Sequence, residues 1–235
     1  MKWKNRFFVL ATTLIALLLV SVSAVGAEPA LQIDPNNFVS AVTNPYFPLE
    51  PGTTFIYKGE SDGAPTRDVM TVTNDTKVIL GVTTTVVHHL SYEDKVLVEE
   101  TFDWFAQDVD GNVWYFGEDT KEFDENGNVI STAGSWEAGV DGAEAGIIML
   151  ADPQVGDRYY QEFYRGEAED QAKVLQLDAS ICVSYGCFDN VIVTKEWTRL
   201  EPGVVEYKYY AEGVGFIFAE MVKGGEEYSE LVKVR

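Results

Sequence analysis

Residues 96–123 read VLVEETFDWFAQDVDGNVWYFGEDTKEF, two runs rich in aromatic and β-branched residues on either side of a short polar stretch. Residues 96–107 and 113–123 alternate with the period of two that is typical of strands. Between them lies Asp110-Gly111, a pair that favours a tight hairpin turn because both residues tolerate positive φ. This stretch therefore predicts two antiparallel strands joined by a short turn.

The same pattern continues outward along most of the chain. Further runs with strand composition lie at residues 54–59, 69–73, 82–90, 158–165, 172–177, 191–198, 204–211, 215–222 and 228–234. No long stretch carries a convincing helical stripe of apolar side chains. We therefore expect an all-β protein, an antiparallel barrel or sandwich of roughly 11–14 strands.

Three short blocks of the first half recur in the second half at an offset of 104–105 residues. The block from Pro48 to Phe55 resembles the block that begins at Pro153, and two more pairs begin at Gly81 and Trp104. A constant offset favours an internal duplication. We expect one β domain, residues 28–235, made of two similar halves at about 48–130 and 153–235.

Residues 131–152 fall outside this repeat and are rich in glycine and alanine. Long connections of this kind are usually binding loops, lids or linkers. We expect an irregular segment that joins the halves. Its apolar end, residues 147–150, would plug one end of a barrel, or the segment would lie over the mouth of a cavity as a lid.

The N-terminus has the pattern of a secretory signal peptide. Three basic residues precede an apolar run at residues 7–20, and small residues follow it. Cleavage is expected after Ala27, or after Ala24, so residues 1–27 would be removed and the protein would be periplasmic or extracellular. The alternative is an uncleaved anchor, but the run is short for a spanning helix, which needs about 20 residues.

The chain is strongly acidic, with 38 Asp and Glu against 17 Lys and Arg and a formal net charge of −21. The expected cleavage removes three basic residues and no acid, so the mature protein would be more negative by three charges. Such a charge argues against nucleic acid and anionic membranes as partners. It serves solubility, or it gives the protein affinity for cations. The sequence gives no indication of an oligomeric state.

Two cysteines, Cys182 and Cys187, are the only ones in the chain. An even number in an exported protein favours a disulfide, and the turn-like residues between them would place the pair on facing strands. The spacing lacks the pattern of redox or zinc sites. We expect a local structural crosslink.

His88 and His89 are the only histidines. Neighbouring residues of a strand point to opposite faces, so the two rings cannot easily share one metal ion. His88 continues the apolar row of Val82 and Val86 and is expected to face the core, with His89 on the other face.

Asp108, Asp110 and Asn112 carry alternating side-chain oxygens of the kind that calcium prefers. The helix-loop-helix calcium pattern fails, because it needs glycine at its sixth position and Val113 stands there. Asp-Gly and Asn-Gly pairs are also the preferred residues of hairpin turns. We favour turns, with calcium as the only cofactor left open.

Aromatic residues exceed what the strands need for an ordinary core. We expect most of them to be buried, with the surplus lining a ligand cavity or stacking on sugar rings. The residues predicted to contact a small-molecule or saccharide ligand are Trp104, Trp114, Tyr115, Trp136 and Glu137.

Residues 44–52 (NPYFPLEPG), 110–118 (DGNVWYFGE) and 134–142 (GSWEAGVDG) resemble those of a group of secreted bacterial proteins without assigned activity. The resemblance covers most of the mature chain. It implies export, and it supplies no catalytic or binding residues.

The favoured hypothesis is an exported, non-enzymatic protein that binds an apolar or amphipathic ligand between two curved half-sheets. The first alternative is a hydrolase or lyase acting on an extracellular polymer through paired carboxylates such as Glu118, Glu137 or Asp141. The second is a calcium-stabilised surface or matrix protein.

Overall fold

The computed structural model describes residues 33–235, so the predicted signal peptide lies outside the described residues. Strands are the dominant regular structure of the described part, and its only helical element is the short 3-10 turn η1 (Pro35–Asn37). No helix among these residues is long and apolar enough to span a membrane. The expected all-β fold is confirmed.

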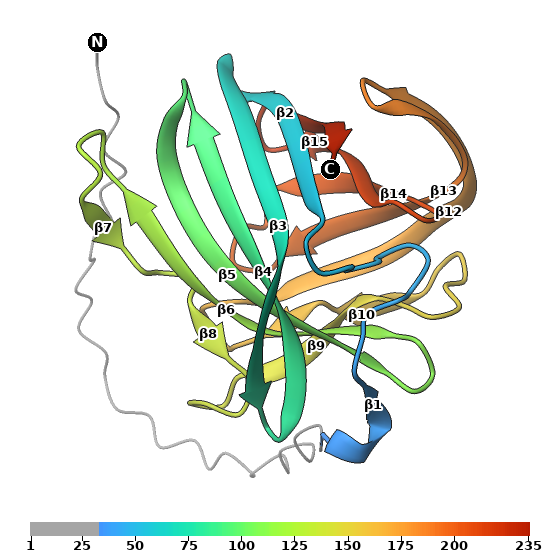
Figure 1. The fold of residues 1–235 in the computed structure, drawn as a ribbon. Coiled ribbons are helices and arrows are strands. Elements are labelled where there is room, and N and C mark those ends of the chain that lie inside the picture. Colours follow the sequence, from blue (N-terminus) through green and yellow to red (C-terminus); the bar gives the residue numbers. More distant parts are fainter. Residues whose placement is uncertain (1–32) are drawn as a thin grey trace, which may run out of the picture. The chain divides into compact units, whose positions relative to one another are not determined.

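Sixteen strands follow one another within residues 33–235, and all are members of one antiparallel sheet system (Figure 1). They are β1 (Phe38–Val39), β2 (Thr54–Ser61), β3 (Ala64–Ile79), β4 (Val82–Glu93), β5 (Val96–Asp108), β6 (Val113–Phe123), β7 (Val129–Ser131), β8 (Trp136–Glu137), β9 (Glu144–Met149), β10 (Arg158–Tyr160), β11 (Glu162–Phe163), β12 (Asp170–Val183), β13 (Gly186–Thr198), β14 (Val205–Ala211), β15 (Gly215–Lys223) and β16 (Glu227–Val234).

The strands wind into a nearly closed barrel. Thirteen of them pair in the order β10-β12-β13-β14-β15-β16-β2-β3-β4-β5-β6-β9-β11. The two ends of this order, β10 and β11, are consecutive in the chain and are separated only by Gln161. Tyr159 pairs with Ala172 of β12, whereas Glu162 pairs with Ala145 of β9. The short segment that holds β10 and β11 therefore bridges both edges of the sheet and closes the barrel.

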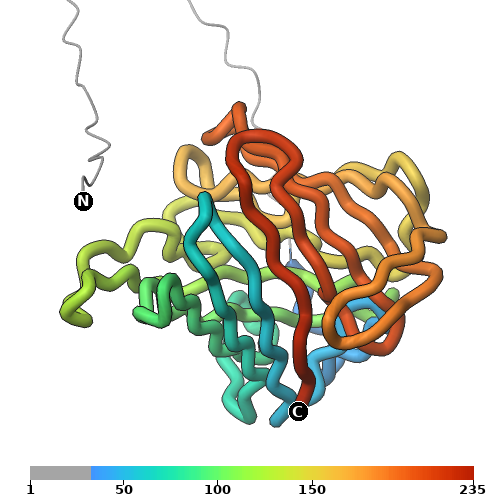
Figure 2. Tube along the Cα trace, turned by 90° about the horizontal axis from the view of Figure 1, so that it is seen from above, coloured from blue at the N-terminus to red at the C-terminus, as the bar shows by residue number. Residues whose placement is uncertain are grey.

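The two halves of the chain form two successive meanders. β2 to β6 and β9, with β11 at their edge, make up one side of the strand order, and β10 with β12 to β16 make up the other. They meet where the last strand, β16, pairs with β2, and Figure 2 shows these strands side by side. At equivalent turns Gly52 donates to the carbonyl of Val72 at 2.8 Å, and Gly156 donates to Val174 at 2.9 Å. This correspondence agrees with the repeat, and a common origin of the halves stays a prediction.

Residues 131–152, which we expected to be irregular, contain two strands. Residues 136–137 form β8, and residues 144–149 form β9, a full strand of the barrel wall between β6 and β11. The small residues there serve close packing. A Cβ atom on Gly146 would lie 2.4 Å from the backbone of Gln161, so only glycine lets β11 approach this closely.

The plug of the barrel comes instead from the lead-in segment, residues 41–50 (Figure 1, blue). The side-chain amide of Asn44 donates to the carbonyl of Gly111 at 2.9 Å, in the β5–β6 turn. On the other side, the carbonyl of Pro45 accepts from Gly213, in the β14–β15 turn. Phe47 packs against Phe105, with ring centroids 5.3 Å apart. The segment thus spans two turns of opposite halves and covers that end of the barrel.

The predicted disulfide is confirmed. Cys182 and Cys187 are bonded, with a Cα–Cα distance of 4.0 Å, and they face each other near the tip of the β12–β13 hairpin. The pair lies outside the barrel cavity and acts as a local crosslink.

Candidate functional site

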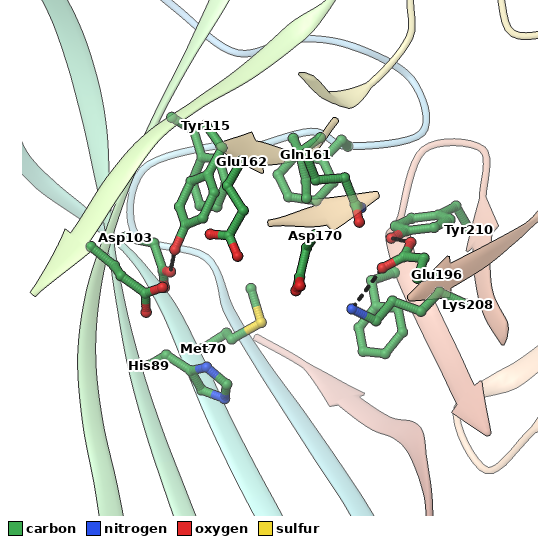
Figure 3. Close-up of a pocket in the computed structure, with 15 residues that line it drawn as sticks. Met70, His89, Asp103, Tyr115, Gln161, Glu162, Asp170, Glu196, Lys208 and Tyr210 are labelled. Atoms are coloured by element: carbon green, nitrogen blue, oxygen red, sulfur yellow. Dashed lines mark hydrogen bonds and ion pairs between the residues drawn. The ribbon is translucent and has the colours of Figure 1, made fainter. Parts of the chain in front are cut away.

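A cavity of about 320 Å³ lies inside the barrel, between the two halves (Figure 3). Its wall combines aromatic and aliphatic side chains with an unusual number of ionisable ones. The lining residues are Phe47, Met70, His89, Asp103, Phe105, Tyr115, Glu118, Ile148, Gln161, Glu162, Asp170, Glu196, Lys208, Tyr210 and Phe216.

A β-bulge places two of the acidic residues on this wall. Along β5–β6, Asp103 pairs with Glu118 and Phe105 pairs with Tyr115, so one residue of β5 faces two of β6. The extra residue is accommodated at Gly117, whose φ is +127°. A bulge shifts the alternation of a strand by one residue. For this reason Tyr115 and Glu118, three positions apart, both face the cavity.

Asp103 and Glu118 are each held by a single hydroxyl donor. The hydroxyl of Tyr115 donates to Oδ1 of Asp103 at 2.7 Å. The hydroxyl of Thr120 donates to Oε2 of Glu118 at 2.7 Å. Both bonds fix the carboxyl groups toward the cavity and use one oxygen of each.

Glu162 is held in the same way from a third strand. It is 9 % exposed, and its Oε2 accepts from the indole N–H of Trp136 at 3.0 Å. The next residue back, Gln161, is 4 % exposed and points its side-chain amide into the cavity (Figure 3). No hydrogen-bond partner of this amide occurs among residues 33–235.

Burial shifts the acid–base properties of this wall. Desolvation and the nearby charge of Asp103 raise the pKa of Glu118 to about 7. Desolvation also raises the pKa of Asp103, although His89 and the bond from Tyr115 oppose this shift. For Glu162, burial and the charges of Asp170 and Glu118 raise the pKa. With a pKa of about 7, the carboxyl group of Glu118 changes its charge near neutral pH.

The opposite wall carries a compensated ion pair. Nζ of Lys208 lies 2.9 Å from Glu196 and 3.3 Å from Glu206. Glu196 also accepts from the hydroxyls of Thr194 and Tyr210. Burial disfavours the charged lysine, but the two glutamates outweigh it and raise the pKa of Lys208 well above its ordinary value. The positive charge of Lys208 on this wall is therefore already paired with protein carboxylates.

His89, not His88, faces the cavity, which reverses the expectation. The ring of His89 lies 3.4 Å from Asp68. His88 bonds Glu100 at 2.9 Å on the other side of β4. The apolar row misled the assignment because Val86 and Val87 are both buried, so both faces of β4 are covered at this point. Burial disfavours imidazolium, but Asp68, Asp103 and Glu99 raise the pKa of His89 overall.

The comparisons with known proteins add little to this geometry. No model of a known protein family matches the chain, and no curated protein matches it. Two solved structures are similar to it, each with a TM-score of 0.47. One is a Bacteroides fragilis protein described as exported and as having a YmcC-like fold, with 14 % identity over 81 % of this chain and 98 % of that chain. The other is a Parabacteroides distasonis protein described as a lipoprotein, with 13 % identity over 82 % of this chain and 99 % of that chain.

Of the residues predicted to contact a ligand, the structure places Tyr115 on the cavity wall. Trp136 lies directly behind it, edge-on to the Tyr115 ring at 5.4 Å. Trp104 and Glu137 are outside the cavity. Nζ of Lys77 lies 3.3 Å from the centre of the Trp104 ring and 2.7 Å from the Glu137 carboxylate. Tyr115 thus lines the cavity, Trp136 packs behind the cavity wall, and Trp104 and Glu137 lie outside the cavity.

Trp114, the second residue of β6, contacts the β5–β6 turn region that holds the three residues considered for calcium. Its indole N–H donates to Oδ2 of Asp108 at 2.8 Å. Oδ1 of Asp108 accepts from the backbone N–H groups of Asp110 and Asn112. Because N–H donors occupy both oxygens of Asp108, this carboxylate stabilises the turn. The described part of the chain contains no group of three or more side chains placed to hold a metal ion.

Sequence reasoning missed most of the charged wall. Asp103 stands between Phe102 and Trp104, and Lys208 stands between Tyr207 and Tyr209. A charge inside an aromatic run is a signal that one face of the strand borders a polar space. Glu162 carried no such signal, because β11 is only two residues long.

Proposed function

We propose that this protein is an exported, non-enzymatic binding protein that holds a small amphipathic ligand in the barrel cavity. The single observation that supports this most is the cavity itself, open between the two half-sheets and lined by residues of both. Small-molecule sites are typically clefts of about 300–1,000 Å³ with a mainly apolar wall and a few placed polar groups. The cavity lies at the lower end of that range.

The size of the cavity limits the ligand. A water molecule occupies about 30 Å³ in the liquid, so the cavity has room for about ten heavy atoms. Asp170 on the wall is exposed, whereas Glu162 beside it is buried. Access from solvent therefore runs past Asp170, and the plug segment closes the floor at Phe47.

Calorimetry with small aromatic amphiphiles tests this proposal. The probes are phenethylamine, phenethyl alcohol and phenylpropionate, which share a ring and a short chain and differ in charge. We expect at least one to bind, and we expect Met70→Trp, which fills the cavity, to weaken that binding by about tenfold or more. Val222→Trp adds the same side chain at an exposed position and is the matched control.

Loss of the fold in Met70→Trp would be recognised by circular dichroism, and Ile148→Phe is then the milder filling variant. Absence of binding for all three probes, or equal binding by the filled variant, would contradict the proposal.

The second candidate function is hydrolysis or elimination on an extracellular polymer, favoured by the pairing of Asp103 with Glu118 and by the pKa of Glu118 near 7. A carboxyl group with such a pKa can act as a general acid or base at neutral pH. The test is turnover of pectin, alginate or carboxymethylcellulose by the wild type, with loss of turnover in Glu118→Gln. The other two acids considered from the sequence lie elsewhere, since Glu137 is paired with Lys77 and Asp141 is in an exposed turn.

A further inference from the structure

We infer that the ligand of the cavity is an organic cation, a protonated amine on a small apolar body, whose nitrogen is held by Asp103, Glu118 and Glu162. This inference rests on the proposed function and specifies the chemical class of its ligand. It goes beyond an amphipathic ligand because it assigns the sign of the charge and the atoms that receive it.

The first argument is that each of the three carboxyl groups is held by one donor and keeps one oxygen for the cavity. Oδ1 of Asp103 and Oε2 of Glu162 accept from Tyr115 and Trp136. Glu118 uses its Oε2 for Thr120. Tyr115 has a single hydroxyl proton, which Asp103 takes, so it cannot also serve Glu118. Three oriented acceptors without donors of their own match the three N–H donors of a protonated amine.

The second argument is independent of the acids and comes from Gln161. Its side chain is 4 % exposed, is aimed into the cavity, and has no hydrogen-bond partner among residues 33–235 (Figure 3). The amide is open to the cavity and is not sealed inside the protein, so its partner is water or a ligand held there. Here the cavity is the space from which a partner has to come. A polar ligand next to Glu162 meets this requirement, whereas a purely apolar one does not.

The third argument is the charge balance of the cavity wall. Five carboxyl groups line it, against one lysine and one histidine. Lys208 is already shared between Glu196 and Glu206. His89 is paired with Asp68, which lies outside the lining set. No lysine, arginine or histidine of the described residues forms an ion pair with Asp103, Glu118 or Glu162; His89 acts on Asp103, and Lys208 on Glu162, only through space.

The fourth argument is the aromatic surroundings of these acids. The rings of Phe105 and Tyr115 stack at 4.8 Å, and those of Tyr210 and Phe216 lie 5.9 Å apart on the other side. Aromatic faces attract ammonium groups and also bury the apolar body attached to them. Carboxylates framed by aromatic rings are thus a suitable environment for an organic cation and a poor one for an anion.

The same three probes test the sign of the charge, in calorimetric titrations at pH 8. Phenethylamine should bind at least about tenfold more tightly than phenethyl alcohol, and phenylpropionate should not bind. Glu162→Gln keeps the shape and the bond from Trp136 but removes the charge, so it should weaken phenethylamine binding by about tenfold while changing phenethyl alcohol little. Glu60→Gln removes the same charge at an exposed site and should leave both affinities unchanged.

The outcomes separate this inference from the proposed function. If phenethyl alcohol or phenylpropionate binds as tightly as the amine, and Met70→Trp abolishes that binding, the cavity is a ligand site but the inference is wrong. If no probe binds, both fail. If Glu162→Gln does not fold, Glu118→Gln provides the same comparison, and an unchanged affinity for the amine would overturn the inference.

Discussion

At the scale of single residues, the unusual feature is that three acids face a common space inside a barrel. Folding brings Asp103, Glu118 and Glu162 to one cavity, where desolvation by burial is the main cause that raises the pKa of each, and neighbouring carboxylates add to it. Such an arrangement costs stability, and natural proteins commonly accept this cost at functional sites. The proposed amine ligand would relieve it.

This cost predicts how stability depends on pH. The pKa of Glu118 rises from 4.5 to about 7 on folding, so the folded protein holds a proton that the unfolded chain releases. Its contribution is therefore favourable at low pH and is lost as the pH rises from about 5 to about 7. His89 and the other two acids act in the same direction. We expect the melting temperature to fall over this interval.

Glu118→Gln should remove part of this dependence, because glutamine resembles the protonated acid and still accepts from Thr120. At pH 8 the variant should be more stable than the wild type by about 1–3 kcal/mol, and at pH 4 it should be equal. Urea denaturation at the two pH values measures this difference, with Glu60→Gln as the exposed control. A variant that is less stable at pH 8 would contradict the assigned pKa shift.

At the scale of structural elements, the plug segment is the part whose role follows most directly from its contacts. Asn44 is 3 % exposed, and its amide donates to the carbonyls of Gly111 and Leu150. Asn44→Ala leaves both carbonyls unsatisfied at the barrel end, so we expect a loss of about 2–3 kcal/mol in the free energy of unfolding. Asn36→Ala is the control, since the Asn36 side chain is exposed and bonds only Asp34.

Chemical denaturation measures both variants. Equal effects of the two substitutions would show that the segment does not close the barrel. An accompanying loss of probe binding in Asn44→Ala alone would connect the plug to the cavity.

The strands were the predictable part of the fold, because residues 96–107 and 113–123 alternate clearly and are bounded by Asp-Gly and Asn-Gly turns. The bulge at Gly117 was not predictable, since it depends on the close approach of Trp136 from β8. For this reason the sequence singled out Tyr115, which lines the cavity, but could not place Asp103 or assign Glu118 to the same wall. The segment that holds β10 and β11 could not be predicted either, because strands of two or three residues contain too few side chains to show a period of two.

At the scale of the whole molecule, the strand order explains why the cavity lies where it does. Each half supplies one curved meander, and the halves join at β16–β2 and through the segment that holds β10 and β11. The cavity lies between the meanders: Asp103 and Glu118 come from the first half, Glu162 comes from the segment that closes the barrel, and the Glu196–Lys208 pair comes from the second half. Because the cavity is lined by residues of both halves, its two walls can carry different side chains while each half keeps its own sheet.

Export of the whole molecule stays a prediction, because it depends on residues 1–27, which lie outside the described part. Expression in a bacterium with a secretory pathway should yield a periplasmic or extracellular protein whose N-terminal sequence begins at Glu28, or at Val25 if the cut follows Ala24. Mass spectrometry of the mature chain decides between these two sites. Recovery of the full-length chain from the membrane fraction would support the anchor reading instead.

The central claim is that the barrel cavity is a ligand site with a cation-binding wall. The most direct measurement is a crystal structure of the protein grown with phenethylamine. The account predicts the bound amine inside the barrel, its nitrogen within hydrogen-bond distance of Glu118 or Glu162 and its ring against Phe105 or Tyr210. An amine found only on the outer surface, with the cavity filled by water or by rearranged side chains, would contradict it.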